Sequence, residues 1–258
     1  MWLSLGLLAA LACAGEAQEG AGAGNSAGET TAATLQSTDG TAVGATSRDG
    51  AESNQPGGRR ARVVLLGTSL TAGLGLDPAR AYPTLLQQKA DSVGYRVEIV
   101  NAGLSGETSA GALRRAGWVL DQPAAAIVLE VGANDGLRGV NPDSTYANLV
   151  AVVAEIRRTQ PAAKILLVQM EAPTNLGRDY TTRFHAAYER AAKDAGIPLL
   201  PFLLDGVAGN PRLNQGDGIH PNAEGSRIVA NTMWTALRET FAALDSELRA
   251  SSSSAPAR

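Results

Sequence analysis

The stretch RVVLLGTSL, residues 62–70, joins a block of large aliphatic side chains to a glycine and a polar turn. The four consecutive aliphatic residues at 63–66 are typical of a strand that is buried on both faces, as the strands of parallel sheets are. Gly67 ends the strand, and Thr68 and Ser69 follow it directly. The sequence therefore predicts a short buried strand whose carboxyl end carries polar side chains.

Runs of the same kind recur along the chain, separated by helical patterns. The further predicted strands are residues 95–100, 125–131, 164–169 and 197–201. The predicted helices, which gather apolar side chains on one face, are residues 82–92, 108–120, 141–160, 179–195 and 223–248. Strands that alternate with helices pair in parallel through right-handed crossovers. We therefore expect a three-layer α/β/α sandwich around a parallel sheet of about five strands, with the functional site outside the carboxyl ends of the strands.

The composition divides the chain of 258 residues into four segments. Residues 14–60 are rich in Gly, Ala, Ser, Thr, Glu and Gln, and they cannot bury enough apolar surface to offset the entropy of ordering them. We expect a signal segment at 1–13, a flexible tether at 14–60, the folded domain at 61–248 and a disordered tail at 249–258. The net charge of −3 and the absence of a basic cluster argue against a nucleic-acid partner.

The opening residues MWLSLGLLAALA are apolar but too short to span a bilayer, and they suit the hydrophobic region of a signal peptide. Cys13 follows directly and is the only cysteine, which rules out an internal disulfide. Its position resembles the lipidation site of a bacterial lipoprotein, although such sites prefer Leu where this chain has Ala10. The alternative is that Cys13 is an ordinary residue of a signal peptide that is cleaved further on. Both readings predict an exported protein, either periplasmic or anchored to a membrane through Cys13 and the tether.

Ser69 follows the first predicted strand, and several readings of its turn compete. A phosphate-binding loop needs a lysine after Gly73, and a dinucleotide-binding loop needs a third glycine in step with Gly73 and Gly75, but neither is present. One remaining reading makes Ser69 a helix cap. The other makes it a nucleophile at a strand-to-helix turn, where the helix N-terminus favours developing negative charge.

Ser26 also stands in a G-x-S-x-G pattern, but no strand precedes it in the tether, so we exclude it as a nucleophile.

A serine hydroxyl needs a base to accept its proton, and the chain has only 2 histidines. His185 lies within a predicted helix among charged neighbours, which is typical of a surface position. His220 lies in the turn DGIHPN, residues 217–222, three positions after Asp217. Asp217 can hydrogen-bond one ring nitrogen of His220 and leave the other nitrogen for Ser69. The alternative is that Asp217 merely shapes the loop before the last helix.

Acyl transfer also needs hydrogen-bond donors for the oxyanion, and two predicted strand ends offer them. Gly106 follows the second predicted strand in the stretch NAGLSGETSAG and can expose a backbone N–H. Asn134 follows the third in the stretch EVGANDGLRG and can donate from its side-chain amide, although a plain turn or helix cap also explains it. His, Cys and carboxylate side chains with metal-ligand spacing are absent from the sequence, so we expect neither a metal nor a cofactor.

With these residues in place, the chain resembles the SGNH (GDSL-type) hydrolase family. The blocks of the family match in order: Ser69 after the first strand, then Gly106, then Asn134, and finally Asp217 with His220. The stretches NAGLSGETSAG, EVGANDGLRG, PLLPF and DGIHPN are similar to those of the bacterial thioesterase I, lysophospholipase and arylesterase group. The resemblance implies a flavodoxin-like SGNH hydrolase fold. It makes Ser69 the nucleophile, His220 the general base and Asp217 its orienting partner. The oxyanion hole would consist of the N–H groups of Ser69 and Gly106 and the amide of Asn134.

The resemblance implies a serine esterase that hydrolyses carboxylic esters or thioesters, such as aryl esters, acyl thioesters and lysophospholipids, through an acyl-enzyme. We expect it to act as a monomer on small acyl substrates. One alternative is a carbohydrate O-deacetylase of the same superfamily. An alternative from another class is a surface binding module whose catalytic set is inactive. Thr68 permits that reading, since it stands where the family's first block usually has aspartate.

Several leucines near the proposed site suggest an apolar acyl pocket. By analogy with the family, residues 136–140 and 171–179 would flank this pocket. The leucines expected to line it are Leu74, Leu104 and Leu137.

Overall fold

The computed structural model of the chain describes residues 59–253. The strands within this part are β1 (Ala61–Gly67), β2 (Val97–Gly103), β3 (Ala126–Glu130), β4 (Lys164–Val168) and β5 (Leu199–Leu200). The longer helices are α2 (Tyr82–Ser92), α3 (Ser109–Val119), α5 (Pro142–Thr159), α6 (Arg178–Ala195) and α7 (Ala223–Ser253). Short helical segments stand in the connections: α1 (Ser69–Ala72), η1 (Pro78–Arg80), α4 (Ala133–Leu137) and η2 (Thr174–Leu176).

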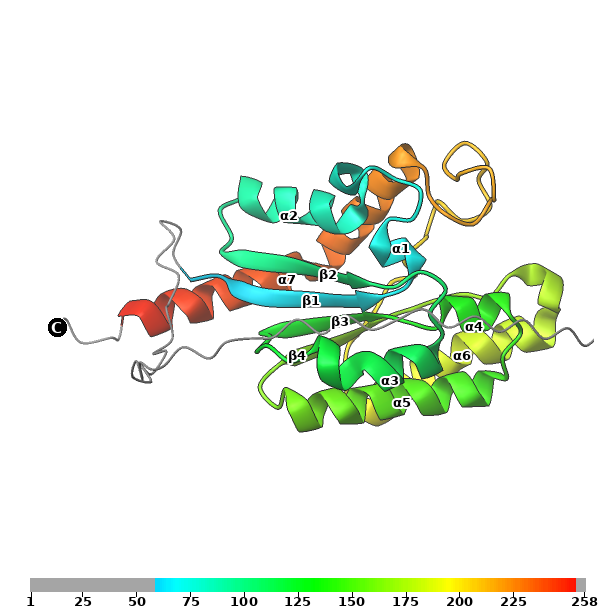
Figure 1. Cartoon of the computed structure of the whole chain (residues 1–258), viewed down its shortest axis with the longest axis horizontal. Helices are drawn as coiled ribbons and strands as arrows, with labels where there is room; N and C mark the ends of the chain where they lie inside the picture. Colours follow the sequence, from blue (N-terminus) through cyan, green and yellow to red (C-terminus); the bar gives the residue numbers. More distant parts are fainter. Residues whose placement is uncertain (1–58, 254–258) are drawn as a thin grey trace, which may run out of the picture. The chain divides into compact units, whose positions relative to one another are not determined.

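The strands form a parallel sheet in the order β2-β1-β3-β4-β5. The chain runs from β1 outward to β2, crosses back over β1 to β3, and continues to β5, so the direction of sheet growth reverses between β1 and β3. Figure 1 shows α2 and α7 on one face of the sheet and α3, α5 and α6 on the other. The predicted α/β/α sandwich with five parallel strands is confirmed. Ligands of such sheets bind outside the carboxyl ends of the strands, at the reversal.

Two adjacent interior strands, β1 and β3, carry the most deeply buried side chains of the sheet. Residues 63–66 of β1 and 126–129 of β3 are at most 1% exposed. Helices cover both faces of these strands, which is why their sequences are continuous apolar runs rather than alternating patterns. Phe184 and Tyr188 of α6 and Phe241 of α7 are wholly buried in the same core. Each such side chain contributes about 2 kcal/mol of burial free energy, so the sheet and its helices form a stable base for the loops.

Glycine allows α1 to lie directly on the end of β2. A Cβ at Gly103 would lie 2.7 Å from Ala72 Cα and 2.8 Å from the carbonyl oxygen of Thr68. A residue with a side chain would therefore push the α1 backbone away from the sheet. Asn101 adds a hydrogen bond from Nδ2 to the Thr71 carbonyl at 2.9 Å. The turn after β1 is thus held against the neighbouring strand.

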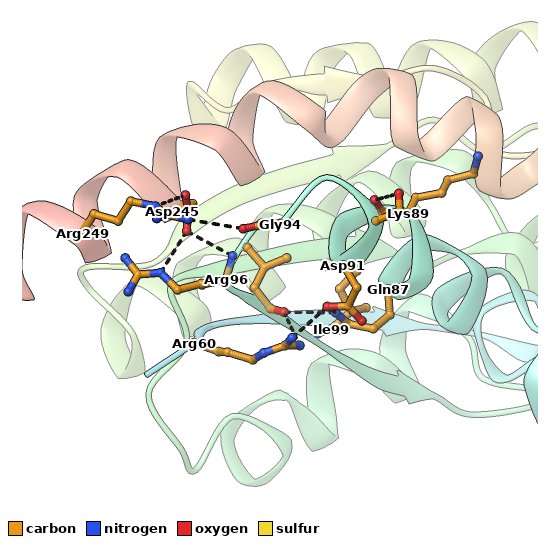
Figure 2. Close-up of polar contacts among 11 residues, drawn as sticks. Arg60, Gln87, Lys89, Asp91, Gly94, Arg96, Ile99, Asp245 and Arg249 are labelled. Atoms are coloured by element: carbon orange, nitrogen blue, oxygen red, sulfur yellow. Dashed lines mark hydrogen bonds and ion pairs between the residues drawn. The ribbon is translucent and has the colours of Figure 1, made fainter. Parts of the chain in front are cut away.

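The last helix is longer than the sequence predicts. α7 continues to Ser253, so the first part of the expected tail, 249–258, is helical. Arg249 gives the reason: its Nε pairs with Asp245 Oδ2 at 2.6 Å, and its NH2 donates to the Gly94 carbonyl at 3.3 Å (Figure 2). These contacts fix the C-terminal part of α7 to the turn before β2.

Arg60 belongs to the folded domain rather than to the expected tether at 14–60. Its NH2 pairs with Asp91 Oδ1 at 2.8 Å, and its NH1 donates to the Val97 carbonyl at 3.1 Å (Figure 2). The domain therefore begins slightly earlier, because this arginine is tied to both α2 and β2.

The expectations for residues 1–13, including lipidation of Cys13, lie outside the described residues, as does almost all of the tether. Within residues 59–253, no helix combines the length and the apolar character needed to cross a membrane.

Candidate active site

Ser69 lies in the first turn after strand β1. Thr68 caps α1 with its side-chain oxygen, and Ser69 is the first residue of that helix. The capping role that one reading gives to Ser69 therefore belongs to Thr68. N–H groups at the start of a helix have no intrahelical acceptor, so the N–H of Ser69 can face a ligand oxygen. The Ser69 residue is 8% exposed, which shields it from most of the solvent.

His220 and Asp217 meet Ser69 in a continuous chain of hydrogen bonds. His220 Nε2 lies 2.8 Å from Ser69 Oγ, and His220 Nδ1 lies 2.6 Å from Asp217 Oδ2. Asp217 Oδ1 also accepts the backbone N–H groups of Ile219 and His220, at 2.9 and 3.0 Å. The hydrogen bond from the His220 ring, helped by these two N–H groups, lowers the pKa of Asp217 to about 2. Asp217 is therefore ionised at every pH near neutrality.

The loop that carries His220 is fixed at both ends. The backbone N–H of Gln215 donates to the His220 carbonyl at 2.7 Å, and Gln215 Nε2 donates to the Leu74 carbonyl at 2.7 Å. Asn222 begins α7 by accepting the Glu224 N–H at 2.9 Å. The start of α7 and the loop after α1 therefore set the position of the imidazole ring.

Gly106 and Asn134 lie in neighbouring loops at the same edge of the sheet. Gly106 has a φ of 78°, a left-handed conformation that glycine adopts without strain. Asn134 Nδ2 donates to the Glu107 carbonyl, next to Gly106, at 2.9 Å. A side-chain amide carries two protons, so the second proton of Asn134 can serve another acceptor. The Asn134 amide is thus fixed to the residue that follows Gly106.

A buried ion pair holds the loop that contains Gly106. Arg115 Nε and NH2 each donate to a carboxylate oxygen of Glu107 at 2.6 Å. The same NH2 donates to the carbonyl groups of Gly67, at 3.1 Å, and Ala102, at 2.8 Å. Both side chains of the pair are at most 8% exposed. Because a buried pair is costly to break, it fixes the loop after β2 relative to the end of β1.

A second buried carboxyl group lies beneath the Ser69 turn. Glu130, at the end of β3, is 1% exposed and accepts the backbone N–H of Thr68 at 2.8 Å. It also accepts the hydroxyls of Thr68 at 2.9 Å and Thr71 at 2.8 Å, and Tyr82 Oη lies 2.7 Å from Thr71 Oγ1. Burial raises the pKa of Glu130 to about 7, although the hydrogen bonds oppose the rise.

Two cavities lie beside these groups. The smaller, of about 10 Å³, touches Ser69 and His220, includes Leu74 in its lining, and has room for about one water molecule. The larger, of about 470 Å³, falls within the usual size of small-ligand sites. Leu137 lines the larger cavity, whereas Leu104 lines neither cavity and is about half exposed. The other apolar residues of the larger lining include Leu70, Met170, Ala172, Phe202 and Ile219.

His185 is a surface residue of α6. Its Nδ1 lies 2.6 Å from Glu171 Oε1, and its side chain is 46% exposed. The hydrogen bond to Glu171 raises the pKa of His185.

Within residues 59–253, His, Cys, Asp and Glu side chains form no group of three or more that could hold a metal ion.

Sequence reasoning does not find the residues that support the site. Glu130 is the last residue but one of the run AAIVLEV, and a single carboxylate near the end of a buried strand is the one signal that points to it. In the sequence, Glu107 resembles an ordinary charge before a helix, and Arg115 resembles an ordinary charge within it. The lining residues Phe202 and Ile219 give no signal, because apolar loop residues are common.

Comparisons with known proteins identify relatives over the folded part of the chain. Residues 65–228 match the GDSL-like Lipase/Acylhydrolase family. The Esterase TesA of Pseudomonas aeruginosa is 36% identical over 177 residues, which are 68% of this chain and 87% of that protein. The thioesterase 1/protease 1/lysophospholipase L1 of Escherichia coli K12 is 38% identical over 172 residues, which are 66% of this chain and 80% of that protein. A crystal structure of the psychrotrophic esterase EstA of Pseudoalteromonas, inhibited by monoethylphosphonate, has a TM-score of 0.66 and 31% identity, and it covers 70% of this chain and 98% of that one.

We expect Glu130 to make the domain less stable as the pH rises. Its pKa is raised from 4.5 to about 7, so the folded state binds more protons than the unfolded state between these values, and stability falls as the pH rises through them. The titratable groups that interact with this carboxyl group, Tyr82 and Tyr188, have pKa values raised by burial and stay neutral throughout. Glu130→Gln cannot ionise and should remove about 3 kcal/mol of pH dependence, measured by urea unfolding at about pH 5 and about pH 8. An equal pH dependence in both proteins would contradict the expectation.

Proposed function

The chain belongs to the GDSL-like lipase/acylhydrolase family, as its motifs predict, and from this premise we propose that it is a serine esterase that acts on carboxylic esters or thioesters through an acyl-enzyme. The observation that carries the proposal is the hydrogen-bonded chain from Ser69 through His220 to Asp217. Such a chain lets a hydroxyl lose its proton in the same step in which it attacks.

In the first half of the reaction, Ser69 Oγ forms a bond to the carbonyl carbon of the substrate while His220 Nε2 accepts the hydroxyl proton. The carbonyl π electrons move to the oxygen and give a tetrahedral oxyanion. The bond to the leaving oxygen or sulfur then breaks, and the leaving group takes the proton from the imidazolium of His220. The products of this half are an alcohol or thiol and the acyl ester of Ser69.

In the second half, water replaces the alcohol. His220 Nε2 accepts a proton from water as the water oxygen bonds to the acyl carbon. The new oxyanion collapses, the bond to Ser69 Oγ breaks, and the proton on His220 returns to Ser69. The carboxylic acid leaves, and the enzyme regains its starting state.

Asp217 acts through His220 rather than on the substrate. Its carboxylate fixes the proton on Nδ1, which leaves Nε2 as the acceptor that faces Ser69. Because the pKa of Asp217 is lowered to about 2, the carboxylate also stabilises the imidazolium while that cation exists.

The oxyanion would be bound by the N–H groups of Ser69 and Gly106 and by the Asn134 amide. Each donor of this kind typically contributes about 10²–10³ in rate. Support comes from Glu107, the residue after Gly106, since the Asn134 amide donates to its carbonyl and Arg115 pairs with its side chain. Donors that are already fixed need not reorganise when the charge develops.

We assign the larger cavity to the acyl group of the substrate. It lies against Leu70, next to Ser69, and against Gly218 and Ile219, which stand between Asp217 and His220. Its predominantly apolar lining suits an alkyl chain, whose burial contributes about 0.8 kcal/mol per methylene. The relatives described above are named as esterases and thioesterases, so the carbohydrate deacetylase and the inactive binding module are not favoured.

Export, with a periplasmic or Cys13-anchored protein, is a separate proposal. It rests on residues 1–13, which carry the apolar run and the cysteine. We further propose that the protein acts as a monomer on small acyl substrates.

Ser69→Ala should abolish ester hydrolysis, because the attacking oxygen is removed while the fold is untouched. With p-nitrophenyl esters we expect kcat/KM to fall by about 10⁴-fold or more. Ser92→Ala, at the surface end of α2, is the matched control and should leave the rate unchanged. Circular dichroism checks that both variants are folded, and turnover by folded Ser69→Ala at the wild-type rate would remove Ser69 from its role.

Ala208→Phe should shorten the acyl chain that the enzyme prefers. Ala208 is exposed at the rim of the larger cavity, so a phenyl ring there can enter the cavity without disturbing the core. We expect kcat/KM for long-chain esters to fall by about tenfold and that for acetyl esters to stay unchanged. Ala186→Phe, on the exposed face of α6, is the control. A uniform loss over all chain lengths would place the acyl group elsewhere.

A further inference from the structure

Glu130 makes contacts that converge on one short turn of the backbone. Its Oε2 lies 2.8 Å from the Thr68 N–H and 2.8 Å from Thr71 Oγ1, and its Oε1 lies 2.9 Å from Thr68 Oγ1. Thr68 and Thr71 lie on either side of Ser69 in the sequence. The carboxyl group of Glu130 is therefore hydrogen-bonded to the turn on both sides of the proposed nucleophile.

The Glu130 carboxyl group packs closely against the backbone of the turn. Gly67 pairs in register with Glu130, and a Cβ at Gly67 would lie 2.6 Å from Glu130 Oε2. Glycine thus permits the carboxyl oxygen to reach the Thr68 N–H. The hydroxyl of Thr68, which donates to Glu130, is also the cap of α1, with the Leu70 N–H 3.5 Å from its oxygen. Movement of Glu130 would therefore displace both the cap and the first residues of α1.

Packing alone does not account for a carboxyl group at this place. Glu130 follows four fully apolar residues of β3 and is 1% exposed. A buried carboxyl group costs free energy that an aliphatic residue of similar size avoids. Its pKa, raised to about 7, reflects that cost. The hydrogen bonds offset part of this free-energy cost, and they fix the backbone at Thr68.

We propose that Glu130 is a positioning residue for the reaction: by accepting the Thr68 N–H and the hydroxyls of Thr68 and Thr71, it sets the place of the Ser69 Oγ and N–H. The proposal rests on the esterase function above. Both protonation states of Glu130 can serve, because Oε2 remains an acceptor when Oε1 carries a proton and donates it to Thr68 Oγ1.

The same geometry explains how the chain works with threonine at position 68. An aspartate there would bring a second carboxyl group close to Glu130, and two such groups cannot both ionise, so one would have to keep a proton. The Thr68 hydroxyl supplies a proton donor without that requirement. Thr68 and Glu130 therefore act as a pair, in which the Thr68 hydroxyl donates a hydrogen bond to the Glu130 carboxyl group.

The test compares two replacements of Glu130 in the full chain. Glu130→Gln keeps an acceptor for the Thr68 N–H and a donor for Thr68 Oγ1, whereas Glu130→Met keeps the length of the side chain but removes both. We expect Glu130→Met to lower kcat and the rate of labelling by a fluorophosphonate probe by about 10²-fold, with KM unchanged, since misplacing a reacting atom costs about that much. Glu130→Gln should stay close to the wild type in both measurements.

Asp245→Leu is the matched control. Asp245 is another buried carboxylate, but it lies in α7 beside Arg96 and Arg249 (Figure 2). Arg96 directly precedes β2, so this pair lies at the amino ends of the strands, whereas Ser69 follows the carboxyl end of β1. Its replacement should lower the melting temperature and leave kcat and the labelling rate unchanged. Loss of stability alone is therefore distinguished from loss of positioning.

Thr68 gives a second test that does not depend on how Glu130→Met folds. Thr68→Val has the shape of threonine without the hydroxyl and should label about tenfold more slowly, the value of one hydrogen bond. Thr68→Ser restores the hydroxyl and should restore the rate.

Wild-type rates in folded Glu130→Met and Thr68→Val would overturn the proposal. Equal losses in Glu130→Gln and Glu130→Met would also overturn it, because hydrogen-bond acceptance would then not be the cause. Each of these results leaves the esterase function standing if the wild type is active and Ser69→Ala is not. An inactive wild type would instead remove the function itself.

Discussion

The hydrogen bond between His220 Nε2 and Ser69 Oγ is the constraint on which the rest of the structure depends. It joins residues 151 positions apart at a distance of 2.8 Å. A different strand order, or a different starting position for α7, would separate Ser69 from His220. The position of β1 between β2 and β3 puts Ser69 where sheet growth reverses, and the loop that ends in Asn222 brings His220 to the same edge. The fold thus converts a long separation along the chain into proton-transfer range.

Buried polar groups, rather than apolar contacts, set the geometry of this edge. Glu130 ties the end of β3 to the turn after β1, and the Arg115–Glu107 pair ties the loop after β2 to the Gly67 carbonyl. Buried charges are costly, yet they are directional, and an apolar contact would allow the loops to slide. The apolar core carries the stability of the domain, while these groups give its carboxyl edge a definite shape.

The sequence predicts the features that local patterns encode. The continuous apolar runs of β1 and β3 identify the central strands, and the scarcity of histidine directs attention to His220 in its turn. Apart from the pairing of Ser69 with His220, which the chemistry of the two side chains suggests, contacts between distant segments escape prediction. The partners of Glu130 at the nucleophile turn lie up to 62 residues away, and the end of α7 depends on a contact between Arg249 and a carbonyl 155 residues earlier. Leu104, which the sequence suggests for the pocket, lines neither cavity and is about half exposed, since proximity to Gly106 in the sequence does not decide which side chains line a cavity.

The most direct test of whether Ser69, His220 and Asp217 act as one unit is the site of covalent capture. The wild-type chain is treated with a fluorophosphonate, digested, and mapped by mass spectrometry. We expect one phosphonate adduct on the Ser69 hydroxyl, because only a serine next to a base attacks such a probe quickly. An adduct on another residue, or none in a preparation that hydrolyses esters, would show that the chemistry takes place elsewhere.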